Sequence, residues 1–167
     1  MYIEYGSKAK DTNPEWKWQS FSPRLNAGRN YLMFGILCKG VRTNPTFSFE
    51  GKGLPENLGL YARVDSRLFI SDSSPDEEGH CSMEEAERYS RVGHKIIEQQ
   101  GKPTWVEHPD WHSHTWLTLE EFEAALNFYN ENAQPKWELP EYEAILAAMK
   151  RFDEMGYDTR LIFWFDN

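Results

Sequence analysis

Hydrophobic and polar positions alternate in two short runs near the start of the chain. MYIEY (residues 1–5) alternates around Glu4, and WKWQSF (16–21) alternates again after the turn-rich GSKAKDTNPE. A period of two is typical of half-buried strands, and two such runs across a polar loop indicate a β-hairpin. Near the other end, five consecutive apolar residues (161–165) predict a central strand that is buried on both faces.

Helical periodicity and helix boundary signals predict about four helices between these strands. The first is GRNYLMFGILCKG, whose apolar residues lie between Gly28 and Gly40. Two capping boxes, in which a Ser or Thr is followed three residues later by Glu, mark further helix starts at Ser82 and Thr118. The fourth helix is LPEYEAILAAMKRFDEMG, with a proline in its first turn and Gly156 after its end.

The stretch from Val41 to Pro75 follows neither period. It is rich in proline and glycine, as in RTNPTFSFEGKGLPENLGLY, and we expect a long irregular excursion here. Because the strands lie at both ends of the chain and do not alternate with the helices, the pattern predicts an α+β fold. The expected architecture is a small antiparallel sheet formed by the N-terminal hairpin and the C-terminal strand, packed with about four helices in a single domain (1–167).

Composition narrows the classes of partner. Aromatic residues make up 15% of the 167 residues, more than a core of this size requires, so we expect some rings to line a surface groove. A formal net charge of −9 disfavours a nucleic acid polymer as partner, and no apolar run approaches the roughly 20 residues of a membrane span. We therefore expect a cytoplasmic protein with no membrane partner, while a homo-oligomer stays open. Cys38 and Cys81 form no CxxC pair, and we expect them to be a core thiol and a loop thiol.

The stretch HPDWHSHTWLT (108–118) contains three of the chain's five histidines. If it is extended, the period of two places all three histidines and Asp110 on one face. Imidazoles and carboxylates are the ligands of zinc and manganese sites, so Asp110, His112 and His114 are candidate ligands of one divalent metal. The alternative is a hydrogen-bonded loop that precedes the helix and holds no metal.

Parts of this stretch resemble the metal-binding motifs of known hydrolases. DWHSHT resembles the D-x-H-x-H-[ST] motif of polymerase-and-histidinol-phosphatase-type metallohydrolases, and HSH is similar to the metal pair of MPN-type deubiquitinases. The further ligands of both families have no counterpart here, and no histidine follows His114. The resemblance is confined to the motif.

A second cluster combines arginines with a glycine-flanked helix start. Arg24, Arg29 and Arg42 lie in SPRLNAGRNY and KGVR, next to asparagines. A helix N-terminus offers free N–H groups and a partial positive charge, and arginine adds a two-pronged donor, so this cluster suits a phosphate or carboxylate. The alternative is that these arginines pair with acidic residues. With polar and aromatic residues near the strands added, the candidate ligand-binding set is Arg24, Arg29, Asn30, Arg42, Trp111, His112, His114, Trp116 and Asp166.

Several stretches of the chain resemble a family of small phage and prophage proteins. They are GRNYLMFGILCKGVR, GLPENL, HSHTWLTLEEF, EYEAILAAMK and the terminal RLIFWFDN, and they span most of the chain in the order found in that family. The resemblance implies a phage origin and a single domain, and it implies no particular activity. Members typically carry a Cys-Asp-Ile-His run ahead of a segment like YIEY, where this chain has Met1. If the Asp and His of that run join His112 and His114 in a site, this chain lacks part of it, and the metal interpretation is weakened accordingly.

Three functions fit these observations. The first is a phage-type protein that binds and sequesters a small anionic, nucleotide-like molecule as a counter-defence sponge, without cofactor or catalysis. The second is a metal-dependent phosphoesterase, in which zinc or manganese on Asp110, His112 and His114 activates water. Glu107 or His108 would be its general base. The third is an inhibitor that binds a host protein through exposed tryptophans.

Overall fold

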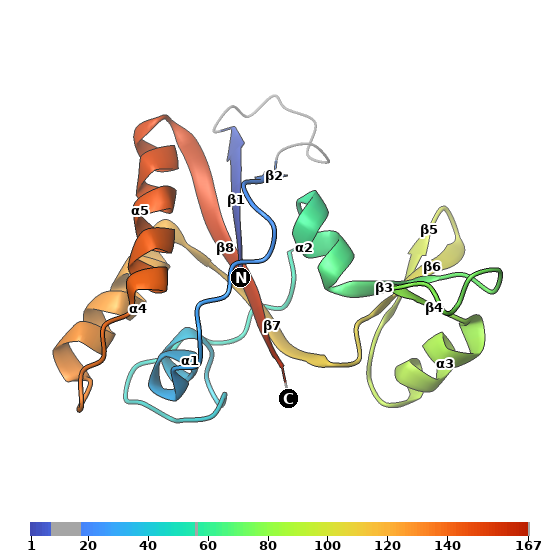
Figure 1. Ribbon diagram of the computed structural model, residues 1–167, viewed down its shortest axis with the longest axis horizontal. Coiled ribbons are helices and arrows are strands. Elements are labelled where there is room, and N and C mark those ends of the chain that lie inside the picture. Colours follow the sequence, from blue (N-terminus) through green and yellow to red (C-terminus); the bar gives the residue numbers. More distant parts are fainter. Residues whose placement is uncertain (8–17, 56, 167) are drawn as a thin grey trace.

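The N- and C-terminal strands meet in one sheet. The computed structural model describes residues 1–7, 18–55 and 57–166. The first of its two sheets, sheet A, has the antiparallel strand order β2-β1-β8-β7 (Figure 1). The α+β prediction is confirmed, since the N-terminal hairpin and the C-terminal strand share this sheet; the expected hairpin residues within 8–17 lie outside the described ranges. The strands of sheet A are β1 (Tyr2–Ser7), β2 (Trp18–Ser20), β7 (Trp111–Thr118) and β8 (Tyr157–Asp166).

Three helices cover one face of sheet A (Figure 1). They are α1 (Tyr31–Leu37), α4 (Leu119–Asn132) and α5 (Pro140–Glu154). The capping box predicted at Thr118 is present and fixes the start of α4 directly after β7. Each fully buried apolar side chain contributes about 1.5–3 kcal/mol, so the contact between these helices and the sheet supplies most of the packing energy. Core residues at this contact include Ile3, Leu37, Leu117, Phe122, Met149, Leu161 and Phe163.

The opposite face of sheet A packs against α2 (Leu60–Asp65) through a smaller apolar cluster. Next to it lies a buried ion pair, in which Glu4 Oε2 accepts hydrogen bonds from Arg160 Nε at 2.8 Å and Nη2 at 2.7 Å. Glu4 Oε1 accepts a third bond, from the Gly59 N–H at 2.7 Å. Glu4 and Arg160 are paired in register across β1 and β8, so this pair connects two strands to the loop that leads into α2.

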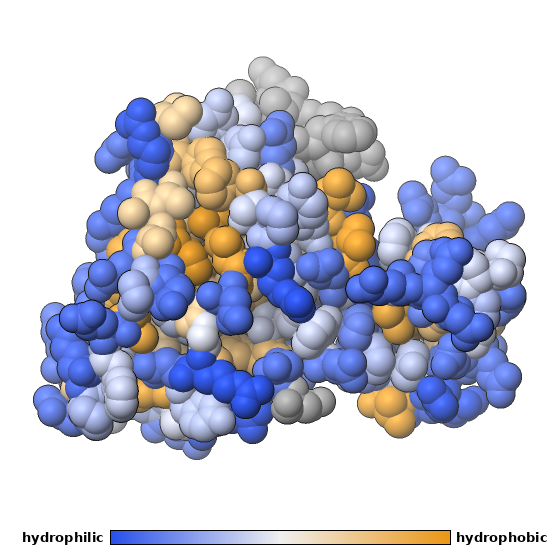
Figure 2. All heavy atoms as spheres, viewed as in Figure 1, coloured by the Kyte–Doolittle hydropathy of each residue, from blue (hydrophilic) through white to orange (hydrophobic). Residues whose placement is uncertain are grey.

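The outer surface of α2 remains open. Figure 2 shows a mostly hydrophilic face with a hydrophobic patch over α2, where Leu60, Tyr61 and Val64 are exposed. No helix in the described ranges is long and apolar enough to cross a membrane.

A second, smaller sheet lies beyond α2 and was not predicted. Its strand order is β4-β3-β6-β5, and α3 packs on it through Cys81, Ala86 and Val106. The expectation that Val41–Pro75 is irregular throughout is therefore wrong, because the stretch contains α2 and β3. Cys81 is buried rather than a loop thiol, whereas the expected core position of Cys38 is confirmed. The elements are β3 (Arg67–Ile70), β4 (His80–Cys81), α3 (Met83–Arg91), β5 (Ile96–Gln99) and β6 (Lys102–Glu107).

Candidate functional site

A bulge in β7 interrupts the HSH motif. His112 pairs with Phe165 and Thr115 pairs with Phe163, so three steps along β7 match two steps along β8. The extra residue needs a local break in the extended backbone, and Ser113 supplies it with a φ of +52°. Beyond the bulge, each side chain of β7 points to the face of the sheet opposite to the one that strict alternation predicts.

The two histidines of this motif consequently point to opposite faces of sheet A. The His112 ring lies 6.0 Å from the ring of Phe165, which belongs to the core under the helices. The His114 ring lies 5.4 Å from Trp164, which packs in the cluster on the other face. The prediction that the polar residues of 108–114 share one face is wrong, because a strict period of two requires a strand without a bulge.

Asp110, the third predicted metal ligand, lies in the turn before β7, next to the candidate general base His108. The His108 ring stacks on Trp111 with 4.9 Å between centroids, and its Nδ1 accepts a hydrogen bond from the Asp110 N–H at 3.3 Å. Within residues 1–7, 18–55 and 57–166, no group of three or more His, Cys, Asp or Glu side chains could hold a metal ion. Asp110, His112 and His114 are therefore not assembled into a ligand set.

His114 lies in an apolar environment. Its Nε2 is buried and has no hydrogen-bond partner in the described part of the chain. Burial lowers the pKa of His114 to about 4, against a smaller opposing contribution from the Glu107 carboxylate. The imidazole is therefore neutral at pH 7 and packs as a ring against Trp164.

Four of the predicted ligand-binding residues do converge. Arg24, Arg29, Trp111 and Asp166 line one cavity of about 730 Å³, here named the arginine cavity. It lies where residues 21–30 pass the ends of β7 and β8. Its volume falls in the range of about 300–1,000 Å³ that is typical of small-molecule sites.

The backbone of residues 21–30 is fixed along β1. The Leu25 N–H donates to the Met1 carbonyl at 2.8 Å, which extends the pairing of β1 beyond β2. Gly28 then turns the chain toward α1 with a φ of +68°, and its N–H donates to Asn26 Oδ1 at 3.1 Å. Both arginines of the cavity therefore stand on a segment that is tied to the sheet.

The arginine cavity carries a local positive charge in an acidic protein. Two arginines and one aspartate give its charged lining a formal charge of +1 (2 − 1). Arg29 Nη2 lies 3.7 Å from Asp166 Oδ2, and the Arg24 guanidinium lies over the Trp111 ring at 5.9 Å. Arg42 lines no described cavity, but its Nη2 donates to the Asp166 carbonyl at 3.4 Å.

The tryptophan rings of this cavity are already engaged by protein groups. Trp111 stacks on His108 and carries the Arg24 guanidinium, and its Nε1 donates to the Asp65 carbonyl at 2.9 Å. Trp164 stacks on Tyr2 with 4.9 Å between ring centroids. These rings position the arginine and form apolar walls, and they leave little free ring face for a ligand.

Tyr142 is among the residues that line the arginine cavity, but its hydroxyl is buried in the protein and does not face the cavity. Its side chain is 0% exposed, and its hydroxyl has no hydrogen-bond partner among the described residues. Burial and the neighbouring Glu141 carboxylate raise the pKa of Tyr142, so the group stays protonated and remains a hydrogen-bond donor.

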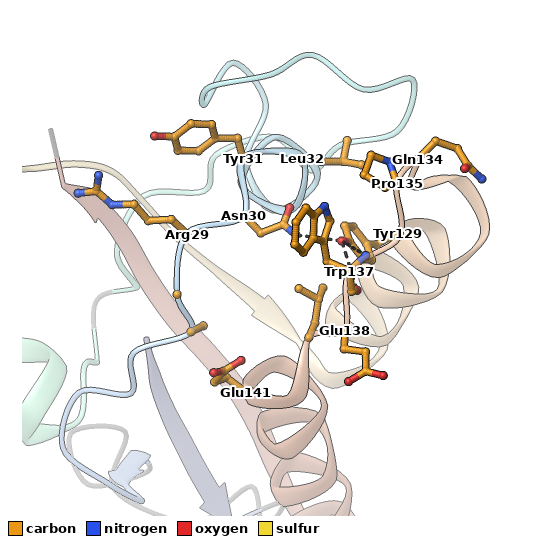
Figure 3. A pocket seen from close by; sticks show the side chains of 13 residues that line it. Arg29, Asn30, Tyr31, Leu32, Tyr129, Gln134, Pro135, Trp137, Glu138 and Glu141 are labelled. Carbon is orange, nitrogen blue, oxygen red and sulfur yellow. Dashed lines mark hydrogen bonds between the residues drawn. The ribbon is translucent and has the colours of Figure 1, made fainter.

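A second cavity of about 500 Å³, here named the tryptophan cavity, lies on the other side of residues 27–29 (Figure 3). Trp137 lines it with an indole that is 66% exposed. Glu138 and Glu141 line it as well. The Arg29 side chain points away from Trp137 (Figure 3) and pairs with Asp166 of the arginine cavity.

Asn30 lies in the tryptophan cavity, but its amide is used within the protein. Its Oδ1 accepts a hydrogen bond from the Met33 N–H at 2.9 Å and so caps α1. Its Nδ2 donates to the Tyr129 hydroxyl at 2.9 Å, which also contacts the backbone of Trp137. Asn30 therefore connects α1 to α4 and holds the segment that carries Trp137.

Three predicted ligand-binding residues besides Arg42 line neither cavity: His112, His114 and Trp116. The Trp116 ring is covered by the Lys52 ammonium group at 4.2 Å. The sequence analysis missed Trp137, Glu138 and Glu141, which lie in PKWELPEYE. The sequence shows a tryptophan just before a helix start, but the exposure of its side chain becomes apparent only in the structure.

Comparison with protein-family models, with curated proteins and with solved structures finds no match to this chain. The site therefore has to be interpreted from its own geometry.

Proposed function

We propose that the protein binds and sequesters a small anionic, nucleotide-like molecule, with the anionic group in the arginine cavity. The observation that carries the proposal is the joint position of Arg24 and Arg29 on one cavity of ligand size. Guanidinium groups bind phosphate through paired, charge-assisted hydrogen bonds. The proposal includes a phage-type role as a counter-defence sponge, for which burial of the ligand suffices and no catalytic group is needed.

The contacts of the arginines support an exchange of partners when an anion enters. The Arg29–Asp166 pair is long, at 3.7 Å, and both side chains are mostly exposed, at 70% and 60%. Such surface pairs contribute about 0–1 kcal/mol, so an incoming phosphate can replace the carboxylate at low cost. Arg24 is held against the Trp111 ring and is therefore partly ordered before binding.

The test is isothermal titration of the full chain with inorganic diphosphate and with mono-, di- and triphosphate nucleotides. Binding is expected to weaken at least tenfold in Arg24→Gln and in Arg29→Gln. The charge-matched control is Arg91→Gln on α3, which lines neither cavity and should bind as the wild type does. The proposal fails if no phosphate compound binds, or if the two cavity variants behave like Arg91→Gln.

A further inference from the structure

The tryptophan cavity holds an open aromatic ring directly beside the arginine cavity. We infer that this cavity is a base subsite that selects guanine, so that the ligand is a guanine nucleotide whose phosphates lie in the arginine cavity. The inference rests on the proposed function and specifies its ligand class.

The two cavities adjoin each other along two segments of the chain. Residues 27–29 line both, with Arg29 at the boundary. On α5, the consecutive residues Glu141 and Tyr142 line the tryptophan cavity and the arginine cavity, respectively. A single molecule with a base at one end and phosphates at the other therefore needs only to cross residues 27–29 at Gly28, the one residue among them without a side chain.

Trp137 provides the stacking surface. Six tryptophans lie in the described ranges, and five of them have a ring contact with another aromatic group or a cation. Trp137 is the exception within these ranges, and its indole is 66% exposed. Stacking of a base on an aromatic side chain contributes about 1–3 kcal/mol and is tolerant of base identity, so selection has to come from the rim of the cavity.

The rim of the tryptophan cavity offers carboxylates. Glu138 and Glu141 make no ion pair or side-chain hydrogen bond in the described part of the chain, although both line the cavity. An ionised carboxylate is an acceptor only and takes two parallel donors. Guanine presents two adjacent donors, N1–H and the N2 amino group, whereas adenine and cytosine place a ring acceptor next to their amino group. A carboxylate therefore favours guanine and repels the acceptor edge of the other bases.

Charge assigns the two ends of the ligand. Carboxylates at the tryptophan cavity repel phosphate, and the guanidinium groups at the arginine cavity attract it. Arg29 points away from Trp137, toward the arginine side (Figure 3). The orientation of the nucleotide follows from this separation of opposite charges across residues 27–29.

The experiment compares GMP, AMP, CMP and UMP by titration, with the part of the tryptophan fluorescence change that is lost in Trp137→Phe as a second readout. GMP is expected to bind at least tenfold more tightly than AMP. Glu141→Gln should remove most of that preference, because the amide loses one acceptor for guanine and gains a donor for the acceptor edge of adenine, so GMP affinity should fall and AMP affinity should rise. The matched control is Glu143→Gln, which removes a charge from the same turn of α5 at an exposed position outside the cavity. Trp137→Ala should weaken all four nucleotides and leave diphosphate binding intact.

The outcomes separate this inference from the proposed function. If diphosphate and all four nucleotides bind through Arg24 and Arg29 with equal affinity, the guanine subsite is overturned and the anion site stands. If Glu141→Gln changes binding no more than Glu143→Gln does, the carboxylate has no role in base selection. Displacement of GMP by millimolar tetramethylammonium would instead identify a site for organic cations and overturn the inference as well.

Discussion

At the scale of single residues, the bulge in β7 decides which histidines meet. Ser113 is a non-glycine residue with a φ of +52°, a conformation that costs roughly 1 kcal/mol for an L-residue. The strain persists because the strands on both sides are fixed by pairing with β8. The alternation of polar and apolar residues in the sequence does not reveal this bulge.

Ser113→Gly is expected to stabilise the protein by up to about 1 kcal/mol, because glycine adopts this conformation without the steric cost and loses only part of the gain to unfolded-state entropy. Urea denaturation measures the change. Ser113→Ala is the matched control, since it removes the hydroxyl but keeps the strain, and it should not stabilise. A loss of stability in the glycine variant would contradict the assignment of strain to this position.

His114 makes the stability of the protein depend on pH. Its pKa is lowered to about 4 from the ordinary 6.5, so the unfolded chain binds a proton more readily than the folded protein does. The free energy of unfolding therefore has its full value above pH 6.5. It decreases as the pH falls from 6.5 toward 4, because over this range protonation of His114 favours the unfolded chain. Between pH 7 and pH 5 this group alone is expected to remove about 2 kcal/mol from the free energy of unfolding.

Urea denaturation at both pH values, on the wild type and on His114→Phe, isolates this contribution. The phenylalanine variant keeps a ring against Trp164 and should lose about 2 kcal/mol less on acidification than the wild type does. Equal pH dependence in the two proteins would mean that the imidazole is not desolvated as described.

At the scale of elements, the buried pair of Glu4 and Arg160 ties β1, β8 and the entry of α2 together. Glu4→Met should destabilise the protein by about 3–5 kcal/mol, because it leaves the buried guanidinium without a counter-charge. The double variant Glu4→Met/Arg160→Met should recover much of that loss, since no uncompensated charge remains. The urea midpoints of the two variants test this, and a double variant that is as unstable as the single one would contradict it.

The elements themselves were predictable where their signals are local. The capping boxes at Ser82 and Thr118, and Pro140 at the start of α5, specify helix starts by contacts within one turn, and all three are present. The second sheet escaped prediction because β3 and β4 are four and two residues long. Strands this short show no periodicity, and their pairing depends on partners distant in the sequence.

The same distinction applies to the candidate site. The chemistry of their segment marked Arg24 and Arg29 as candidate ligand-binding residues, and the structure shows that they share a cavity with Trp111 and Asp166. Trp137 could not be recognised from the sequence as a cavity residue, because it lines the cavity only through the position of the 134–139 segment beside α1. The Tyr129 hydroxyl fixes that position across 99 residues of sequence, through its bond with Asn30.

At the scale of the whole molecule, the arginine cavity lies at the ends of β7 and β8, and the tryptophan cavity lies between α1, α4 and the start of α5. The sheet of β3–β6 contributes no lining residue to either. A ligand that spans the two cavities should therefore order one part of the protein only. With GMP at 100 times its dissociation constant, binding stabilises the folded state by about 2.7 kcal/mol. Hydrogen exchange shows where this energy acts, because exchange through local opening slows only in the segments that the ligand holds.

Protection on addition of GMP is expected in residues 24–32 and 137–142, with α3 and β5 unchanged in exchange that proceeds by local opening. Diphosphate alone should protect 24–32 and leave the amides around Trp137 as in the free protein, since it fills only the arginine cavity. This contrast separates the two ends of the ligand on one protein without any substitution. Protection centred on α3 or β5 would place the ligand on the other sheet, where none of the residues argued above could contact it.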